Sequence, residues 1–260
     1  IATIMRSKKY AKMMYPQYFY PEFKQFYDME YSRLVLKELN CKADYSETDQ
    51  EKMNLFEQKR KCGENDLLYF QLMQRDSVDE YIRYVNEINF PTQEKNGPSI
   101  FETNQFLLNR KPTSIEYAAF YGSINIFNYL LLHNSQLTPS LWLYSIHGRN
   151  PEIIHILEEN GIVPLDSYLP PLLEAIKCHH NEIANYILDK YCSEIISNIQ
   201  DSWHQQILKS FNYYYFPNEL NKNMHYFFYL CKYDHCNFVK LLLHEGKIDI
   251  NAKHIFKFCG

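Results

Sequence analysis

A short pattern of residues recurs along this chain of 260 residues and constrains its fold more than any other feature. Each copy contains a first segment with a small residue at its centre, a turn, and a second segment with apolar residues at i, i+1 and i+4. The first three clear copies follow one another at 27 and 30 residues and the fourth comes 55 residues after the third, and a period near 30 is typical of solenoids built from stacked supersecondary units. The four clearest copies cover residues 117–130, 144–157, 174–187 and 229–242, and a weaker copy covers 67–85.

The spacing predicts an all-α solenoid of stacked helix-turn-helix repeats. Helices this short are marginal alone in water, so each pair has to bury its apolar stripe against its neighbours. A short helical segment is expected over 1–64, before a composition change near Gly63, and the array is expected over 65–260. The stretch 193–224 is interpreted as a degenerate repeat, with an insertion as the alternative. The predicted repeats are 113–137, 138–166, 167–192 and 225–251, with a truncated one at 252–260, so we expect a fragment of a longer array.

Composition narrows the possible partners. The net charge is −4, so no strong positive field is available to attract nucleic acid. No apolar run approaches the 18 or so residues of a membrane span, and the first residues lack the apolar core of a signal peptide. Seven cysteines at scattered spacings are typical of reduced thiols in an intracellular protein, and a cytoplasmic location is expected.

The sequence contains residues that metal binding or catalysis could use. Metal-ligating residue types occur in Cys178-His179-His180, at Cys231 and in His235-Cys236, but their spacing matches no closed zinc motif. The sequence therefore predicts no metal site and no cofactor. It contains no nucleophile elbow, phosphate-binding loop or dinucleotide fingerprint, so no catalytic residues and no small-molecule substrate are expected. Glu158-Glu159 is interpreted as a solvated charge pair at a helix end.

The repeated residues resemble the ankyrin repeat. Ala118-Ala119-x-x-Gly122 followed by Ile126-Phe127-x-Tyr129-Leu130-Leu131 is similar to its central pattern, and 234–243 followed by Ile248-Asp249-Ile250-Asn251 is similar to the same pattern and its link. Together with 98–104, 137–142 and 177–184, these residues look like the large ankyrin-repeat family expanded in trichomonad protists. The Thr-Pro-Leu-His turn of ankyrin repeats is absent as such from this chain. The glycine position of later repeats holds Arg149, His179 and Asp234.

This resemblance implies a non-catalytic scaffold that binds protein partners along the concave face of the stack. In the family, the two positions after the small pair vary to suit the partner. An alternative is the targeting arm of a larger adaptor or effector protein, and a remote one is a metal-dependent enzyme. Carried onto this chain, the partner-binding positions are Phe120, Tyr121, His147, Gly148, Lys177, Cys178, Lys232 and Tyr233.

Overall fold

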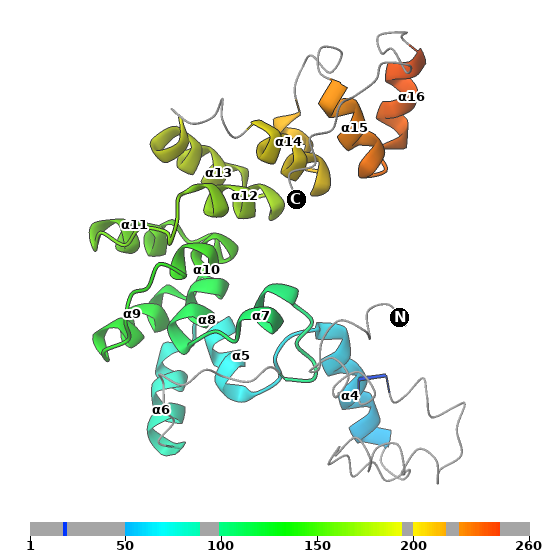
Figure 1. Ribbon diagram of the computed structural model, residues 1–260. Coiled ribbons are helices and arrows are strands. Elements are labelled where there is room, and N and C mark those ends of the chain that lie inside the picture. The colour runs from blue at the N-terminus through cyan, green and yellow to red at the C-terminus, as the bar shows by residue number, and fades with distance from the viewer. Residues whose placement is uncertain (1–17, 20–49, 89–98, 194–199, 217–223, 245–260) are drawn as a thin grey trace. The chain divides into compact units, whose positions relative to one another are not determined.

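The computed structural model of the chain describes residues 18–19, 50–88, 99–193, 200–216 and 224–244 (Figure 1). Within these ranges the structure is helical and contains no β-strand, which confirms the all-α prediction. None of the described helices is long and apolar enough to cross a membrane. The truncated repeat expected at 252–260, the link at 248–251 and most of the segment 1–64 lie outside the described residues.

The contacts divide the chain into two compact units. The first comprises Ile1–Ala118 and Asn125–Ser135, and the second comprises Ala119–Ile124 and Gln136–Gly260. The described helices of the first unit are α4 (Gln50–Cys62), α5 (Leu68–Gln74), α6 (Val78–Ile88), α7 (Gln105–Arg110), most of α8 (Ser114–Tyr121) and nearly all of α9 (Ile124–Leu132). Those of the second are the end of α8, α10 (Leu141–Gly148), α11 (Pro151–Glu159), α12 (Leu169–Lys177), α13 (Asn181–Ile187), α14 (Gln200–Lys209), α15 (Met224–Lys232) and α16 (Cys236–His244).

In the first compact unit, α5 and α6 form the helix pair that the weak copy at 67–85 predicts. Tyr81 is fully buried, and the ring of Phe70 lies 4.5 Å from that of Tyr117 on α8. Asp76, at the turn between α5 and α6, accepts hydrogen bonds from the backbone N–H groups of Asn125 (3.1 Å) and Ile126 (2.9 Å). Its carboxylate therefore caps otherwise unpaired donors at the beginning of α9.

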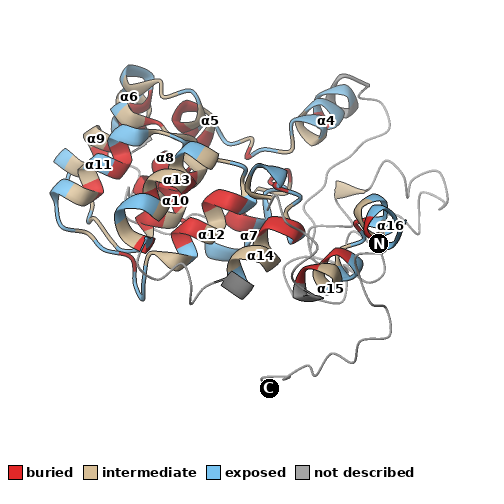
Figure 2. Cartoon of the chain, turned by 90° about the horizontal axis from the view of Figure 1, so that it is seen from above, coloured by how far each residue is buried: buried red, intermediate tan, exposed pale blue. Residues whose placement is uncertain are grey.

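In the second compact unit, three helix pairs follow one another along the chain: α10 with α11, α12 with α13, and α15 with α16. The first helix of the middle pair, α12, packs against α10 and α14, and α14 packs against α15. Figure 2 shows buried residues along α10 and α12. In its described part, the stretch interpreted as a degenerate repeat contains α14, which packs between the first helices of two pairs, and a short 3₁₀ helix, Tyr213–Tyr215.

Small residues lie at the centres of the first helices, as the sequence pattern requires. Ala118, Ser145 and Ala175 are each fully buried. The Ser145 hydroxyl donates to the carbonyl oxygen of Trp142 (3.0 Å), so its polar atom is satisfied within its own helix. A larger side chain at these positions would hold neighbouring helices apart, because protein interiors are close-packed.

Each first helix of the second unit ends in a left-handed residue at the same point of the pattern. Gly122 has a φ of 69°, and in later repeats its place is taken by Arg149, His179 and Asp234, at φ values of 52°, 58° and 61°. Phe211, after α14, has a φ of 56°, which places α14 in the same register as the other first helices. A residue in this conformation allows the chain to reverse at the end of a helix.

The left-handed conformation predicts an effect of mutation at Arg149. Arg149 is exposed, and a residue with a Cβ atom is strained at positive φ, whereas glycine is not. Replacing Arg149 by glycine should raise the free energy of unfolding by about 0.5–1 kcal/mol. Arg149→Ala, which removes the side chain and keeps the strain, is the control and should give no such gain. Equal urea midpoints for the two variants would contradict this explanation.

Residues that directly follow three of these left-handed positions tie one turn to the preceding turn. Each of the three is a histidine or an asparagine, and its side chain donates to a main-chain carbonyl near the end of the preceding first helix. That carbonyl belongs to the residue three positions before the left-handed residue of the preceding turn. These bonds hold neighbouring turns in a fixed register along the stack. They run from His180 Nδ1 to Ile146 (2.7 Å), from Asn212 Nδ2 to Ile176 (2.8 Å) and from His235 Nε2 to Leu208 (2.8 Å).

Candidate functional site

Three of the predicted partner-binding residues meet in a row across successive first helices. The ring of Phe120, on α8, stacks on the imidazole of His147, on α10, with 4.7 Å between ring centroids and 26° between planes. The Sγ atom of Cys178, at the end of α12, lies 3.6 Å from Nδ1 and 3.9 Å from Nε2 of the same imidazole. We call Phe120, His147 and Cys178 the first-helix row.

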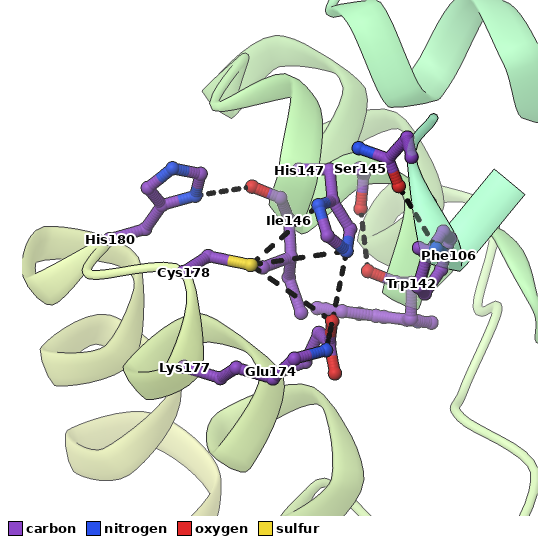
Figure 3. Close-up of polar contacts among 10 residues, drawn as sticks. Phe106, Trp142, Ser145, Ile146, His147, Glu174, Lys177, Cys178 and His180 are labelled. Carbon is purple, nitrogen blue, oxygen red and sulfur yellow. Dashed lines mark hydrogen bonds and ion pairs between the residues drawn. The ribbon is translucent and has the colours of Figure 1, made fainter. Parts of the chain in front are cut away.

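A carboxylate that the sequence analysis did not single out completes this cluster. Glu174, on α12, accepts a hydrogen bond from Nε2 of His147 (3.0 Å) and another from the Lys177 ammonium (2.7 Å), both at Oε1. Figure 3 shows the Cys178 sulfur facing both the imidazole and this carboxylate. The His147 and Glu174 side chains are only 14% and 15% exposed, so the pair is largely shielded from bulk water.

The cluster perturbs its acidic groups in opposite directions. Burial favours the neutral form of Glu174, but the hydrogen bonds from His147 and Lys177 outweigh it and lower the pKa of this carboxyl to about 2. Burial raises the pKa of the Cys178 thiol to about 11, and the neighbouring Glu174 charge adds to this effect. Glu174 is therefore ionised at neutral pH, whereas Cys178 in the isolated protein is a neutral thiol.

The other predicted partner-binding residues have different surroundings. Tyr121 is half-buried and Lys177 is exposed. Phe120 is only 8% exposed, so its ring packs against His147 and offers little surface to a partner. Gly148 lies where α10 crosses the end of α8, and a Cβ atom added there would meet backbone atoms of Ala119 and Gly122. Lys232 and Tyr233 lie at the end of α15. Gln205 on α14 donates to the Tyr233 hydroxyl (2.8 Å), and the Lys232 ammonium lies 5.3 Å from the centre of the Tyr233 ring.

Most of the residues considered as metal ligands from the sequence have structural partners instead. His180 and His235 donate to the main-chain carbonyls described above, and His179 donates through Nε2 to the carbonyl of Ser210 (2.8 Å). Cys236 donates to the carboxylate of Asp234 (2.9 Å). Of that set, Cys178 alone joins a cluster of possible ligands among the described residues, together with His147 and Glu174.

Glu158 corrects the expectation of a solvated charge pair. Its side chain is only 13% exposed, and it accepts hydrogen bonds from the hydroxyls of Tyr186 (2.8 Å) and Tyr191 (2.6 Å) and from the Lys190 ammonium (3.1 Å). Partial burial favours the neutral form, but these hydrogen bonds hold the pKa of Glu158 below its ordinary value. The pattern could not show this, because the tyrosines lie about 30 residues further along the chain.

We expect Glu158→Gln to lower the free energy of unfolding by about 1–3 kcal/mol near neutral pH, because a neutral amide accepts these bonds less strongly. A carboxyl with a lowered folded-state pKa stabilises the protein above its unfolded pKa, and this stability is lost as the pH falls through the folded value. The difference from wild type should therefore shrink below about pH 4.5. Urea titrations across this range, with the exposed Glu159→Gln as control, test it; a difference that does not change with pH would refute it.

Comparisons of the chain with protein-family models, with curated proteins and with solved structures each gave no match.

Proposed function

We propose that this chain is a non-catalytic protein–protein interaction scaffold whose helix pairs are ankyrin-like repeats. Its contact face follows the ends of α8, α10 and α12, where the first-helix row and the neighbouring turns lie. Specificity comes from the partly exposed side chains beside that row, and the buried members hold them in place. Stacked repeats of this kind expose an extended surface on one side and bury a continuous core on the other.

The observation that carries this proposal is the repeated bond from one turn to the next. Because His180, Asn212 and His235 donate to equivalent carbonyls, the ends of α10, α12, α14 and α15 are held in register, and Asn150 donates to the carbonyl of Gly122 (3.0 Å) at the end of α8. Side chains at equivalent positions then form a ladder that a partner segment can contact at several points. A rigid ladder loses little conformational entropy on binding, which favours recognition.

Two exposed or half-buried side chains are the best contacts on this face. Tyr121 presents a large ring with few rotatable bonds, a type that is frequent at energetically important interface positions. Lys177 has a side chain that is 52% exposed and supplies a charge beside Glu174. A partner with an acidic or hydroxyl-bearing segment would match this pair.

Affinity capture from a lysate of the source cells tests whether a partner binds the proposed contact face. The full chain is compared with Tyr121→Ala/Lys177→Glu, and we expect the captured partner to be lost with the double variant because both its ring contact and its charge contact are removed. The matched control is Lys240→Glu on α16, which makes the same charge change at another exposed position. Circular dichroism establishes that each variant keeps its helix content.

Loss of the same partner from the double variant and from Lys240→Glu would indicate a general charge effect and contradict the proposed position of the contact face. A partner retained by the double variant would contradict it as well, and would direct attention to other exposed aromatic residues such as Tyr214. A partner lost with the double variant alone would support the proposal.

A further inference from the structure

Three side chains of metal-ligating types converge from two neighbouring helix pairs. His147 lies near the end of α10, and Glu174 and Cys178 lie four residues apart on α12 and at its end. Residues at this spacing share one face of a helix, and here that face is turned toward α10. One ligand atom from each residue lies within 4.8 Å of the other two.

The distances between these atoms are close to those of a tetrahedral zinc site. Oε1 of Glu174 lies 3.0 Å from Nε2 of His147, and Sγ of Cys178 lies 3.9 Å from Nε2 and 4.0 Å from Oε1. Bonds of about 2.0 Å to nitrogen and oxygen and 2.3 Å to sulfur, at tetrahedral angles, separate the ligand atoms by about 3.3 Å and 3.5 Å. Because Sγ of Cys178 now lies as close to Nδ1 (3.6 Å) as to Nε2 of His147 (3.9 Å), the imidazole must turn until Nε2 points between the sulfur and the carboxylate.

The chemistry of the donors selects the kind of ion. A thiolate, an imidazole and a carboxylate form a set that binds Zn²⁺, whereas Mg²⁺ and Ca²⁺ prefer oxygen ligands alone. The stacked ring of Phe120 restricts the orientation of the His147 imidazole, a supporting role that neighbouring groups play around metal ligands. Because the site is partly exposed, an ion can enter it, and a fourth position is left for water or a partner's atom.

We propose that His147, Glu174 and Cys178 bind one Zn²⁺ ion, which links α10 to α12. On binding, the Cys178 thiol becomes a thiolate and releases its proton to solvent, and the imidazole of His147 carries its proton on Nδ1 in place of Nε2, so that Nε2 is free to bind the ion. This inference does not depend on the proposed function, since an ion could bind here whether or not a partner contacts the same face.

Lys177 gives the proposal a sharp test. Its ammonium lies 2.7 Å from Oε1 of Glu174, the atom that would bind the ion, so the lysine competes with the metal for the carboxylate. The Lys177 side chain is 52% exposed, so its ammonium can move into solvent when an ion takes its place at Glu174. Removing its charge should therefore tighten metal binding, which a purely structural role for the cluster does not predict.

The experiment is a titration of the full chain with Co²⁺ under reducing conditions, followed by displacement with Zn²⁺. We expect one equivalent of Co²⁺ to produce a thiolate-to-cobalt charge-transfer band in the near ultraviolet. Cys178→Ala should abolish the band, and Glu174→Gln should weaken binding about tenfold or more. Lys177→Gln should bind several-fold more tightly. Cys236→Ala removes an exposed cysteine outside the cluster and should leave the band unchanged.

Several results would overturn the site. They are the absence of the band in the wild-type chain with excess Co²⁺, a band that survives in Cys178→Ala, and Lys177→Gln binding no more tightly than wild type. Circular dichroism of each variant establishes that it is folded. Lys177→Gln, at an exposed position, keeps the test decisive if a variant of a buried ligand fails to fold.

Discussion

Replacing Trp142 by alanine is expected to lower the free energy of unfolding by about 3–5 kcal/mol. Trp142 is fully buried on α10, and its ring makes edge contacts with Tyr168 and Tyr191 at centroid distances of 5.2 and 6.1 Å. Its indole N–H donates to the carbonyl of Ile162 (2.8 Å), in the link that leads to the next helix pair. Truncation leaves a large cavity and an unpaired carbonyl.

Urea denaturation measures this loss, and the chain supplies its own controls. Trp142→Phe keeps an aromatic ring and removes the N–H, so it should cost less than the alanine variant. Trp203, the other tryptophan, is only half-buried on α14, and Trp203→Ala should cost less as well. If Trp203→Ala proved more damaging than Trp142→Ala, the packing of α10 against the following helix pair would be contradicted.

Gly148→Ala is the second large effect, at about 3 kcal/mol of lost stability. A Cβ atom at this position would lie 2.6 Å from the backbone nitrogen of Gly122 and still closer to the carbonyl oxygen of Ala119. Backbone atoms of packed helices cannot move aside as a flexible side chain can, so the crossing of α8 and α10 would have to open. The register of the first-helix row would change with it.

Gly161→Ala provides the matched control for Gly148→Ala. Gly161 has a φ of 66°, and nothing lies within 4 Å of a Cβ atom built on it, so substitution costs the backbone strain alone, about 1 kcal/mol. The two variants make the same chemical change, one with a steric clash and one without. Equal losses of stability in thermal or urea unfolding would show that α8 and α10 do not approach this closely.

The helices and their core could be predicted from the sequence because they depend on local pattern. The small positions Ala118, Ser145 and Ala175 are buried as expected, and the positions aligned with Gly122 are left-handed even where the residue is arginine or histidine. Backbone geometry at these positions persists when the glycine does not, since the turn determines φ. The position of a residue within the repeat pattern therefore predicts much of its burial and backbone conformation in the helix pairs.

The arrangement of the candidate site could not be predicted in the same way. His147 occupies the first and Cys178 the second of the two variable positions in their copies of the pattern, and this alone indicates exposure to a partner. Their contact depends on how closely α10 and α12 approach, which the small residues allow but the pattern does not measure. Glu174 escaped notice because it begins its own copy of the pattern, four residues before Cys178. Gly148 also lies at a variable position of the pattern, which predicts that it contacts a partner. In the structure its lack of a side chain allows α10 to approach the end of α8.

The first-helix row lies in the proposed contact face and supplies two of the three proposed zinc ligands, and nuclear Overhauser measurements between its side chains test its arrangement most directly. With selectively labelled Phe and His in the full chain, we expect cross-peaks from the Phe120 ring to the His147 imidazole and from that imidazole to the Cys178 methylene protons. Phe120→Leu and His147→Gln variants assign these peaks. Absence of both cross-peaks in the folded protein would contradict the stacking of α8, α10 and α12 in this register.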